Sequence, residues 1–384
     1  MNLIQRIFDK QAWRNFDMDL KEAMEIGIEN VLGFFDDMWW SAKDSFKTRM
    51  VPRLYSLRYI ARSGKYVITS ESHTDFQELH RIRAIRNIYG LRKIKVGDLG
   101  GFVQSEANLS QEGDCWVDDM AIVRDDAQVI DNAIIRMHAV VSGSAIVSEN
   151  AVVTYDSVVK NEARVRGNAY ITDQSKVTDS AIIEDDARLT VFATLTENSH
   201  AGGNTSIYGR ATLAGRAHVS GHTSIGGRAF ITDDAVVDGS AAVLDNVHVG
   251  GYAHLSDSSS TFGDSIIMGK VSIGGEARVG GNVRIDGEDV KISGSSKVFG
   301  QSLITGRVDM KGGVLDGSVW VRDTTTIEDA PTIMGNAVIG GSSKISGKCH
   351  IGGYAQVDSS EVSGETRYGD DDIVTSKMLD SVLA

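Results

Sequence analysis

Three histidines are spaced so that they could carry chemistry. His200 and His218 lie eighteen residues apart, and His254 follows thirty-six residues after His218. A histidine can act as a general base near neutral pH, and a catalytic zinc site of the three-histidine type needs three converging imidazoles. Val236 interrupts the series, and no carboxylate spacing singles out one histidine. The interpretation we favour is three ordinary exposed histidines, with no metal site and no catalytic residue.

A strict six-residue repeat must position these histidines. An apolar residue recurs at every sixth position from Val117, weakly at Ala201 and Thr261, and continues to Ile285. A helix repeats its buried face every 3.6 residues and a strand every two, so neither explains a period of six. A triangular β-solenoid does, with one short strand and one turn per hexad and three hexads per coil. The segment 102–368 then makes about fifteen coils of eighteen residues.

The residues flanking each repeated apolar position support this fold. A small residue, usually alanine, stands two positions earlier, as at Ala121 and Ala163, where three strands converge on a narrow interior. Gly, Asn or Asp often follows the apolar residue, and these types tolerate the left-handed backbone of a tight corner. The repeat slips three times, landing late at Ile292, shortening to five residues at 311–315 and landing early at Val362.

The two ends of the chain differ from the repeat. Residues 1–50 show apolar residues at three- and four-residue spacing and include Trp13, Trp39 and Trp40, which predicts a helical segment that caps the solenoid or docks on a partner. Residues 51–101 predict a β entry module with strands at 53–60, 66–69 and 79–86. Residues 369–384 predict a short helix that caps the open end of the solenoid.

Composition and charge limit the partners. The net charge is −13, but residues 51–100 carry ten basic and four acidic residues, whereas residues 101–384 carry twenty-two and thirty-nine. An acidic solenoid predicts no binding to nucleic acid, where phosphate contacts dominate affinity. No apolar run is long enough to span a membrane and no secretory leader begins the chain, so we expect synthesis in the cytoplasm. Cys115 and Cys349 occupy inward positions and predict two buried thiols.

The entry into the repeat carries a resemblance. The run from Gly97 to Val117, together with Arg81–Arg86 upstream, resembles the start of a group of bacterial and phage hexapeptide-repeat proteins. Some of these are described as acyltransferases and others as polymer-forming, cytoskeleton-like proteins. The resemblance covers about residues 80–368 and implies a left-handed parallel β-helix. Acyltransferases of this kind would imply a histidine base and a loop that leaves the prism to form the acyl-donor cleft, and this sequence has no such loop.

The outward positions of the first coils suggest an interface. The residue before each repeated apolar position points outward and is often apolar early in the repeat, whereas later coils carry Ser, Thr and His there. Contiguous exposed apolar surface marks an interaction site. With the N-terminal tryptophans, the predicted interface residues are Trp13, Trp39, Trp40, Trp116, Ile122, Ile134, Val140, Val152, Val158 and Tyr170.

These observations predict an all-β solenoid that is structural rather than catalytic and binds no cofactor. We expect a homotrimer attached through residues 1–50 to a larger protein assembly, such as the collar, whisker or decoration of a phage particle. In that setting the protein would reside in the virion after synthesis in the cytoplasm. The alternatives are a hexapeptide-repeat acyltransferase and a cytoskeleton-like scaffold that polymerises.

Overall fold

The computed structural model describes residues 64–90 and 93–375. The helical segment predicted for 1–50, the strand predicted at 53–60 and the residues 376–384 of the predicted C-terminal helix lie outside the described residues. The described chain belongs to two compact units, one containing Arg83–Ile88 and Ile94–Asp98 and the other containing nearly all the rest.

The first unit contains a small antiparallel pairing. Ile88 and Ile94 form a bridge in which each backbone N–H donates to the other residue's carbonyl oxygen, at 2.9 and 3.0 Å. Ala84 and Asp98 continue this pairing, because the Ala84 N–H donates to the Asp98 carbonyl oxygen at 2.9 Å. Both isoleucine side chains are buried.

Strands lie at two of the three positions predicted ahead of the solenoid, 66–69 and 79–86. β1 (Tyr66–Ser72) pairs with β2 (His80–Ala84), and β2 pairs with β3 (Leu99–Val103). β3 then pairs in parallel with β5 (Ile122–Val123), so the entry module adds its last strand directly to a solenoid sheet. A single turn of 3₁₀ helix, η2 (Glu106–Asn108), follows β3 and is the one helical element of the described residues.

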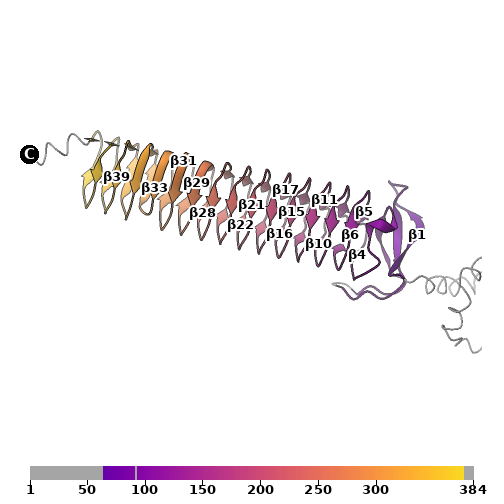
Figure 1. Ribbon diagram of the computed structural model, residues 1–384. Coiled ribbons are helices and arrows are strands. Elements are labelled where there is room, and N and C mark those ends of the chain that lie inside the picture. The colour runs from indigo at the N-terminus through magenta and orange to yellow at the C-terminus, as the bar shows by residue number, and fades with distance from the viewer. Residues whose placement is uncertain (1–63, 91–92, 376–384) are drawn as a thin grey trace, which may run out of the picture. The chain divides into compact units, whose positions relative to one another are not determined.

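The repeat folds as the parallel β-solenoid predicted from the six-residue period. Twenty-five two-residue strands, β4 (Trp116–Val117) to β28 (Ser260–Thr261), begin at six-residue steps. Each pairs in parallel with the strand eighteen residues later, as Val153 pairs with Ile171. Figure 1 shows these coils stacked along one axis from β4 to β28. With ~4.8 Å between paired strands, each coil advances the stack by that distance.

The later coils contain longer strands and the three predicted slips. The strands that follow β28 are β29 (Ile266–Ile273), β30 (Arg278–Val279), β31 (Arg284–Ile292), β32 (Lys297–Val298), β33 (Leu303–Met310), β34 (Val314–Gly317), β35 (Trp320–Val321), β36 (Thr324–Ile327), β37 (Thr332–Gly335), β38 (Val338–Gly340), β39 (Lys344–Ile345), β40 (His350–Ile351), β41 (Gln356–Asp358), β42 (Glu361–Val362), β43 (Arg367–Tyr368) and β44 (Ile373–Thr375). Ile273 pairs with Ile292, Val298 with Leu315, and Ile345 with Val362, as the late, short and early steps of the sequence require.

The strands form the faces of a prism. One face is a 15-stranded sheet from β4 to β43, in which every third strand of the chain is a neighbour except from β28 to β34, where every second strand is. The other two faces are joined into a 29-stranded sheet, because β29, β31 and β33 each run through a corner without interruption. The alternation of side chains in a strand decides which residues enter the prism. Val165 is fully buried whereas its neighbour Arg164 is exposed.

The interior is narrow and mostly apolar. The small residues two positions before the repeated ones, such as Ala121 and Ala163, are fully buried beside the larger side chains, as predicted. Cys115 and Cys349 are buried thiols, which confirms the sequence expectation, and burial raises the pKa of the Cys349 thiol. A few inward hydroxyls, among them that of Ser175, have no hydrogen-bond partner within the described residues.

The corners contain a second hydrogen-bonded ladder that the backbone alone does not provide. Corner residues with positive φ are mostly Gly or Asp, and twelve corner carboxylates accept a hydrogen bond from the backbone N–H one coil later. Asp185 bonds to the Gly203 N–H at 2.8 Å, and Asp257 bonds to the Gly275 N–H at 2.7 Å. The acidic residues of the solenoid are therefore part of its structure.

The C-terminal segment differs from its prediction. A helix is predicted from Gly369, but Ile373–Thr375 forms β44, which pairs in parallel with β41. The described part of this segment therefore adds a further solenoid strand. The segment forms a strand instead of a helix because Val374 enters the interior in the same way as the repeated apolar residues, with 7 % of its surface exposed.

Candidate functional site

The three predicted histidines lie on the outer surface of one face. His200, His218 and His254 are the first residues of β18 (His200–Ala201), β21 (His218–Val219) and β27 (His254–Leu255). The second residue of each strand is fully buried, so the alternation of the strand turns each imidazole outward. The parallel register places His200 beside His218 and then His218 beside Val236. His254 lies beyond Val236, two coils from His218.

A carboxylate joins the first two histidines into a hydrogen-bonded chain. Glu184 Oε1 lies 2.7 Å from His200 Nε2, and His200 Nδ1 lies 2.9 Å from His218 Nδ1. Arg166 donates from Nε to Glu184 Oε2 at 2.5 Å, which completes a row of four polar side chains.

The chain of contacts assigns the imidazole protons. A carboxylate accepts, so the nitrogen of His200 that faces Glu184 donates. In a neutral imidazole the other nitrogen of His200 is then an acceptor, and His218 Nδ1 donates to it. This assignment leaves His218 Nε2 as an acceptor. Burial lowers the pKa of His218, and repulsion from His200 lowers it further, whereas Asp238 and Glu184 act in the opposite direction.

His254 belongs to a separate pair. Its Nε2 lies 2.9 Å from Asp238 Oδ2, with both side chains partly exposed. The three histidines therefore do not converge on one point. Among residues 64–90 and 93–375, no group of three or more His, Cys, Asp or Glu side chains is arranged to hold a metal ion.

The carboxylate partners correct one statement of the sequence analysis. Glu184 precedes His200 by sixteen residues, and Asp238 precedes His254 by the same number. Because a coil has eighteen residues, the residue sixteen positions before a histidine lies in the preceding coil, two positions from the residue that pairs directly with the histidine. Side chains at such diagonal positions can reach one another across the sheet. The spacing of carboxylates therefore did single out two of the three histidines, and His218 alone lacks such a partner.

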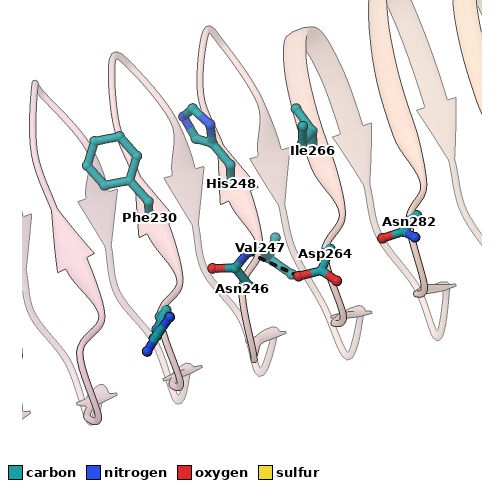
Figure 2. A pocket seen from close by; sticks show the side chains of 8 residues that line it. Phe230, Asn246, Val247, His248, Asp264, Ile266 and Asn282 are labelled. Atoms are coloured by element: carbon teal, nitrogen blue, oxygen red, sulfur yellow. Dashed lines mark hydrogen bonds between the residues drawn. The ribbon is translucent and has the colours of Figure 1, made fainter.

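A shallow hollow lies on a neighbouring face. It measures about 430 Å³ and is lined by a row of outward side chains, Phe230, His248 and Ile266, and by corner residues including Asn246 and Asp264. Figure 2 shows the three outward side chains on successive coils and the Asn246 Nδ2–Asp264 Oδ1 hydrogen bond of 3.0 Å beside them. Its walls are surface side chains at coil spacing, and no carboxylate or imidazole pair converges in it.

The first predicted interface column is covered by the chain itself. Trp116, Ile134 and Val152 pair in register, and their side chains are only 2, 6 and 6 % exposed. Because one chain alone produces this burial, a sister chain is not needed to cover these three residues. Tyr170 continues the column and is partly exposed. Trp13, Trp39 and Trp40 lie outside the described residues.

The second predicted column is covered at its start by the entry module. Ile122 forms a buried cluster with Leu79 and Phe102, and Val140 packs against that cluster. Val158 is the next member and is partly exposed. The guanidinium of Arg81 lies 4.4 Å from the centre of the Phe102 ring and donates to the Gly100 carbonyl oxygen at 2.9 Å. The early apolar residues are thus explained at least in part by packing within the chain.

No protein-family model matches the sequence, and a search of curated proteins also returns no match. Within the described part of the chain, no helix has the length and apolar character needed to cross a membrane.

Proposed function

We propose that this chain is a non-catalytic structural rod, a left-handed hexapeptide-repeat β-helix that a larger protein assembly anchors through residues 1–50. A phage particle, with the rod as collar, whisker or decoration, is the setting that the sequence resemblance favours. The observation that carries the proposal is the unbroken parallel stack from β4 to β44, in which backbone hydrogen bonds connect every coil to the next. Such a stack is suited to spanning distance.

Two features support a mechanical role over a catalytic one. Between Trp116 and Thr261 every corner uses the same six-residue step, so no described loop leaves the prism to form a cleft. The corner carboxylates add a hydrogen bond from coil to coil outside the backbone ladder, as between Asp233 and Gly251 at 2.8 Å. Repeated cross-coil bonds resist bending and local opening, because each coil contacts only its two neighbours.

Removal of the proposed anchor tests the role. A variant that lacks residues 1–50 keeps every described coil, so circular dichroism should show a folded solenoid. Co-sedimentation with the parent particle should be lost, because the anchor segment carries Trp13, Trp39 and Trp40. Truncation after Tyr368 is the matched control and should leave co-sedimentation unchanged. If the variant without residues 1–50 still co-sediments normally, residues 1–50 are not the anchor.

A hexapeptide-repeat acyltransferase is the second candidate, and the Glu184–His200 contact favours it. A carboxylate that orients an imidazole is an arrangement used in general base catalysis. The structural proposal expects no thermal shift with acetyl-CoA, and a full biological role for the variant with His200, His218 and His254 all changed to Ala. A saturable shift, or acyl transfer that His200→Ala abolishes, would establish the catalytic alternative.

A polymerising scaffold is the third candidate. The last described strand, β44, leaves Ile373 56 % exposed at the end of the stack, where a further chain could pair. The structural proposal expects single rods of uniform length in electron micrographs of the purified protein. Filaments that are many rods long would favour the scaffold instead.

A further inference from the structure

One corner of the solenoid is unusual in five successive coils, and we name it the corner ridge. Its residues are 155–156, 173–174, 191–192, 209–210 and 227–228, each pair lying eighteen residues after the last. Most positive-φ corner residues are Gly or Asp, whereas here Tyr155, Val191 and Phe192 have φ of 49, 55 and 63°. A β-branched or bulky residue in this conformation is strained, because Cβ approaches the following carbonyl oxygen. Strain of this kind clusters at functional sites.

The ridge exposes its bulky side chains instead of packing them. Tyr155, Val191 and Phe192 are 47, 44 and 49 % exposed. In the next two coils the first corner position, held by Tyr155 and Val191, is glycine (Gly209 and Gly227), whereas the second position, held by Phe192, is Arg210 and Arg228. We call the coils up to Phe192 the high half of the ridge, because their first corner position carries a side chain, and the two coils after it the low half, because there that position carries none.

The backbone of the ridge also changes at its middle. The second residue of the corner donates its N–H to the preceding coil in the high half, from Gln174 to Tyr155 O at 2.9 Å and from Phe192 to Asp173 O at 3.0 Å. In the low half the Arg210 N–H instead donates to Gly227 O in the following coil. The backbone N–H of the second corner residue therefore points in opposite directions along the stack at Phe192 and at Arg210. The high and low halves have two different turn structures.

Charge along the ridge has opposite signs on the two sides of Phe192. Asp156 and Asp173 are exposed on the N-terminal side, and Arg210 and Arg228 are exposed on the C-terminal side. Within the described residues, no carboxylate lies within ion-pair distance of either arginine. Asp173 has no cationic partner there, and Asp156 has only His138, at 3.6 Å. The guanidinium of Arg210 lies 6.0 Å from the Phe192 ring.

We propose that the corner ridge binds the corner ridge of a second copy of this chain, with the two rods antiparallel and the two-fold axis at Phe192. That arrangement places Asp156 opposite the Arg228 of the second copy and Asp173 beside its Arg210, since each pair is equally distant from Phe192 along the ridge. At the first corner position it also places Tyr155 of each copy opposite Gly227 of the other, and Asp173 opposite Gly209. Isologous contacts of this kind form closed dimers.

Packing the ridges in parallel and in register, as a trimer would, is disfavoured by the same residues. It sets Asp156 against Asp156 and Arg210 against Arg210, and like charges in contact cost affinity. At the first corner position it also sets Val191 against Val191 and each glycine against the same glycine, so bulky positions do not face open ones. A corner is narrow, so the contact area is small and the dimer is expected to dissociate at micromolar concentrations.

The first test uses sedimentation velocity of the full chain over a range of concentrations. Dimers should form at low ionic strength and dissociate in 0.5 M salt, because salt screens exposed charges. Phe192→Ser should weaken dimerisation at least tenfold. Phe230→Ser, which changes an equally aromatic side chain outside the ridge, should leave it unchanged. A monomer at every concentration, or equal effects of the two changes, would overturn the proposal.

The second test determines the orientation of the two rods. Asp156→Arg and Arg228→Asp should each weaken the dimer, and the double variant D156R/R228D should restore it, because each new pair again joins opposite charges. A short bismaleimide should cross-link D156C to R228C in a mixture of the two variants, but should not cross-link D156C to itself. Cys115 and Cys349 are buried and stay in place. Cross-linking of D156C to itself, or no restoration by the double variant, would show that the antiparallel model is wrong.

The third test separates the strain from the contact. Val191→Gly should raise the melting temperature of the monomer, because glycine adopts positive φ without strain. The same change should weaken the dimer, because it removes an exposed apolar side chain from the centre of the ridge. A variant that is more stable and dimerises as tightly as the parent would remove Val191 from the interface and contradict the placement of the axis.

Discussion

The carboxylate of Asp179 accepts a hydrogen bond of 3.2 Å from the backbone N–H of Glu197, the residue that occupies the same corner one coil later. Glu197 repeats the contact and accepts from the Gly215 N–H at 2.6 Å. Asp179 also accepts from the Thr196 hydroxyl at 2.5 Å. These contacts, with that of Thr196 the most important, lower the pKa of Asp179 from 3.8 to about 2.

The first prediction follows from this pKa. The folded state holds the Asp179 carboxyl at a lower pKa than the unfolded chain, so the unfolded chain takes up a proton first as the pH falls. The stabilisation by Asp179 is therefore complete above about pH 4 and disappears as the pH falls through about 2. Asp179→Asn keeps a side chain that tolerates positive φ but removes the charge, and should cost about 1 kcal/mol at pH 7. Thermal melts from pH 2 to 7 measure the difference.

A nearby aspartate gives the control for this experiment. Asp126 is exposed, and within the described residues its side chain makes no hydrogen bond. Asp126→Asn should leave the melting temperature nearly unchanged at every pH. If Asp179→Asn and Asp126→Asn behave alike, the corner carboxylates do not stabilise the stack and the ladder has no energetic role.

The second prediction concerns which side of a strand enters the prism. Val165→Asp places a carboxylate where the native side chain is fully buried, and no partner is available in the narrow interior. The cost should be on the order of several kcal/mol. Arg164→Asp changes the adjacent, exposed position of β12 (Arg164–Val165) and should be nearly silent. Chemical denaturation measures both, and equal losses would mean that the inward and outward positions are assigned wrongly.

The coil architecture was predictable because it depends on local spacing. An apolar residue at every sixth position can enter the interior only if each hexad makes one strand and one turn. For the same reason the one-residue slips near Ile292 and Val362 could be recognised in the sequence. The hydrogen bonds of the acidic corners were not predicted. Their hydrogen bonds join residues eighteen apart, and the sequence-based interpretation had assigned Asp only a conformational role.

The site was less predictable because its contacts cross between columns. The histidines were found because they share one column. Glu184 lies in the adjacent column and was missed, although its spacing of sixteen residues from His200 can be recognised in the sequence. The burial of Trp116 could not be read from the repeat at all. The repeat determines only that this side chain points outward, and burial depends on chain outside the repeated positions.

The third prediction tests a row of amides on the solenoid surface. Asn132 Nδ2 donates to Asn150 Oδ1, and Asn150 Nδ2 donates to Asn168 Oδ1, each at 3.2 Å. Asn150→Ala breaks both bonds and should lower the free energy of unfolding by about 1 kcal/mol, since each bond is exposed. Asn204 occupies the same column and its side chain makes no hydrogen bond within the described residues, so Asn204→Ala should have little effect. Equal effects would show that the amide row contributes nothing measurable.

The fourth prediction concerns the pH response of the paired histidines. Burial and the neighbouring His200 keep the pKa of His218 below its ordinary value of 6.5 in the folded state. The unfolded chain therefore binds the proton first, and the stabilisation present above pH 6.5 is lost as the pH falls through the folded pKa. The parent protein should lose more thermal stability between pH 8 and pH 5 than the variant His218→Asn, which cannot titrate. His200→Asn removes the repulsion and should raise the pKa of His218, while burial still holds it below 6.5. Imidazole chemical shifts followed by NMR give that pKa directly, and a value at or above 6.5 in the parent protein would contradict the proposed cause.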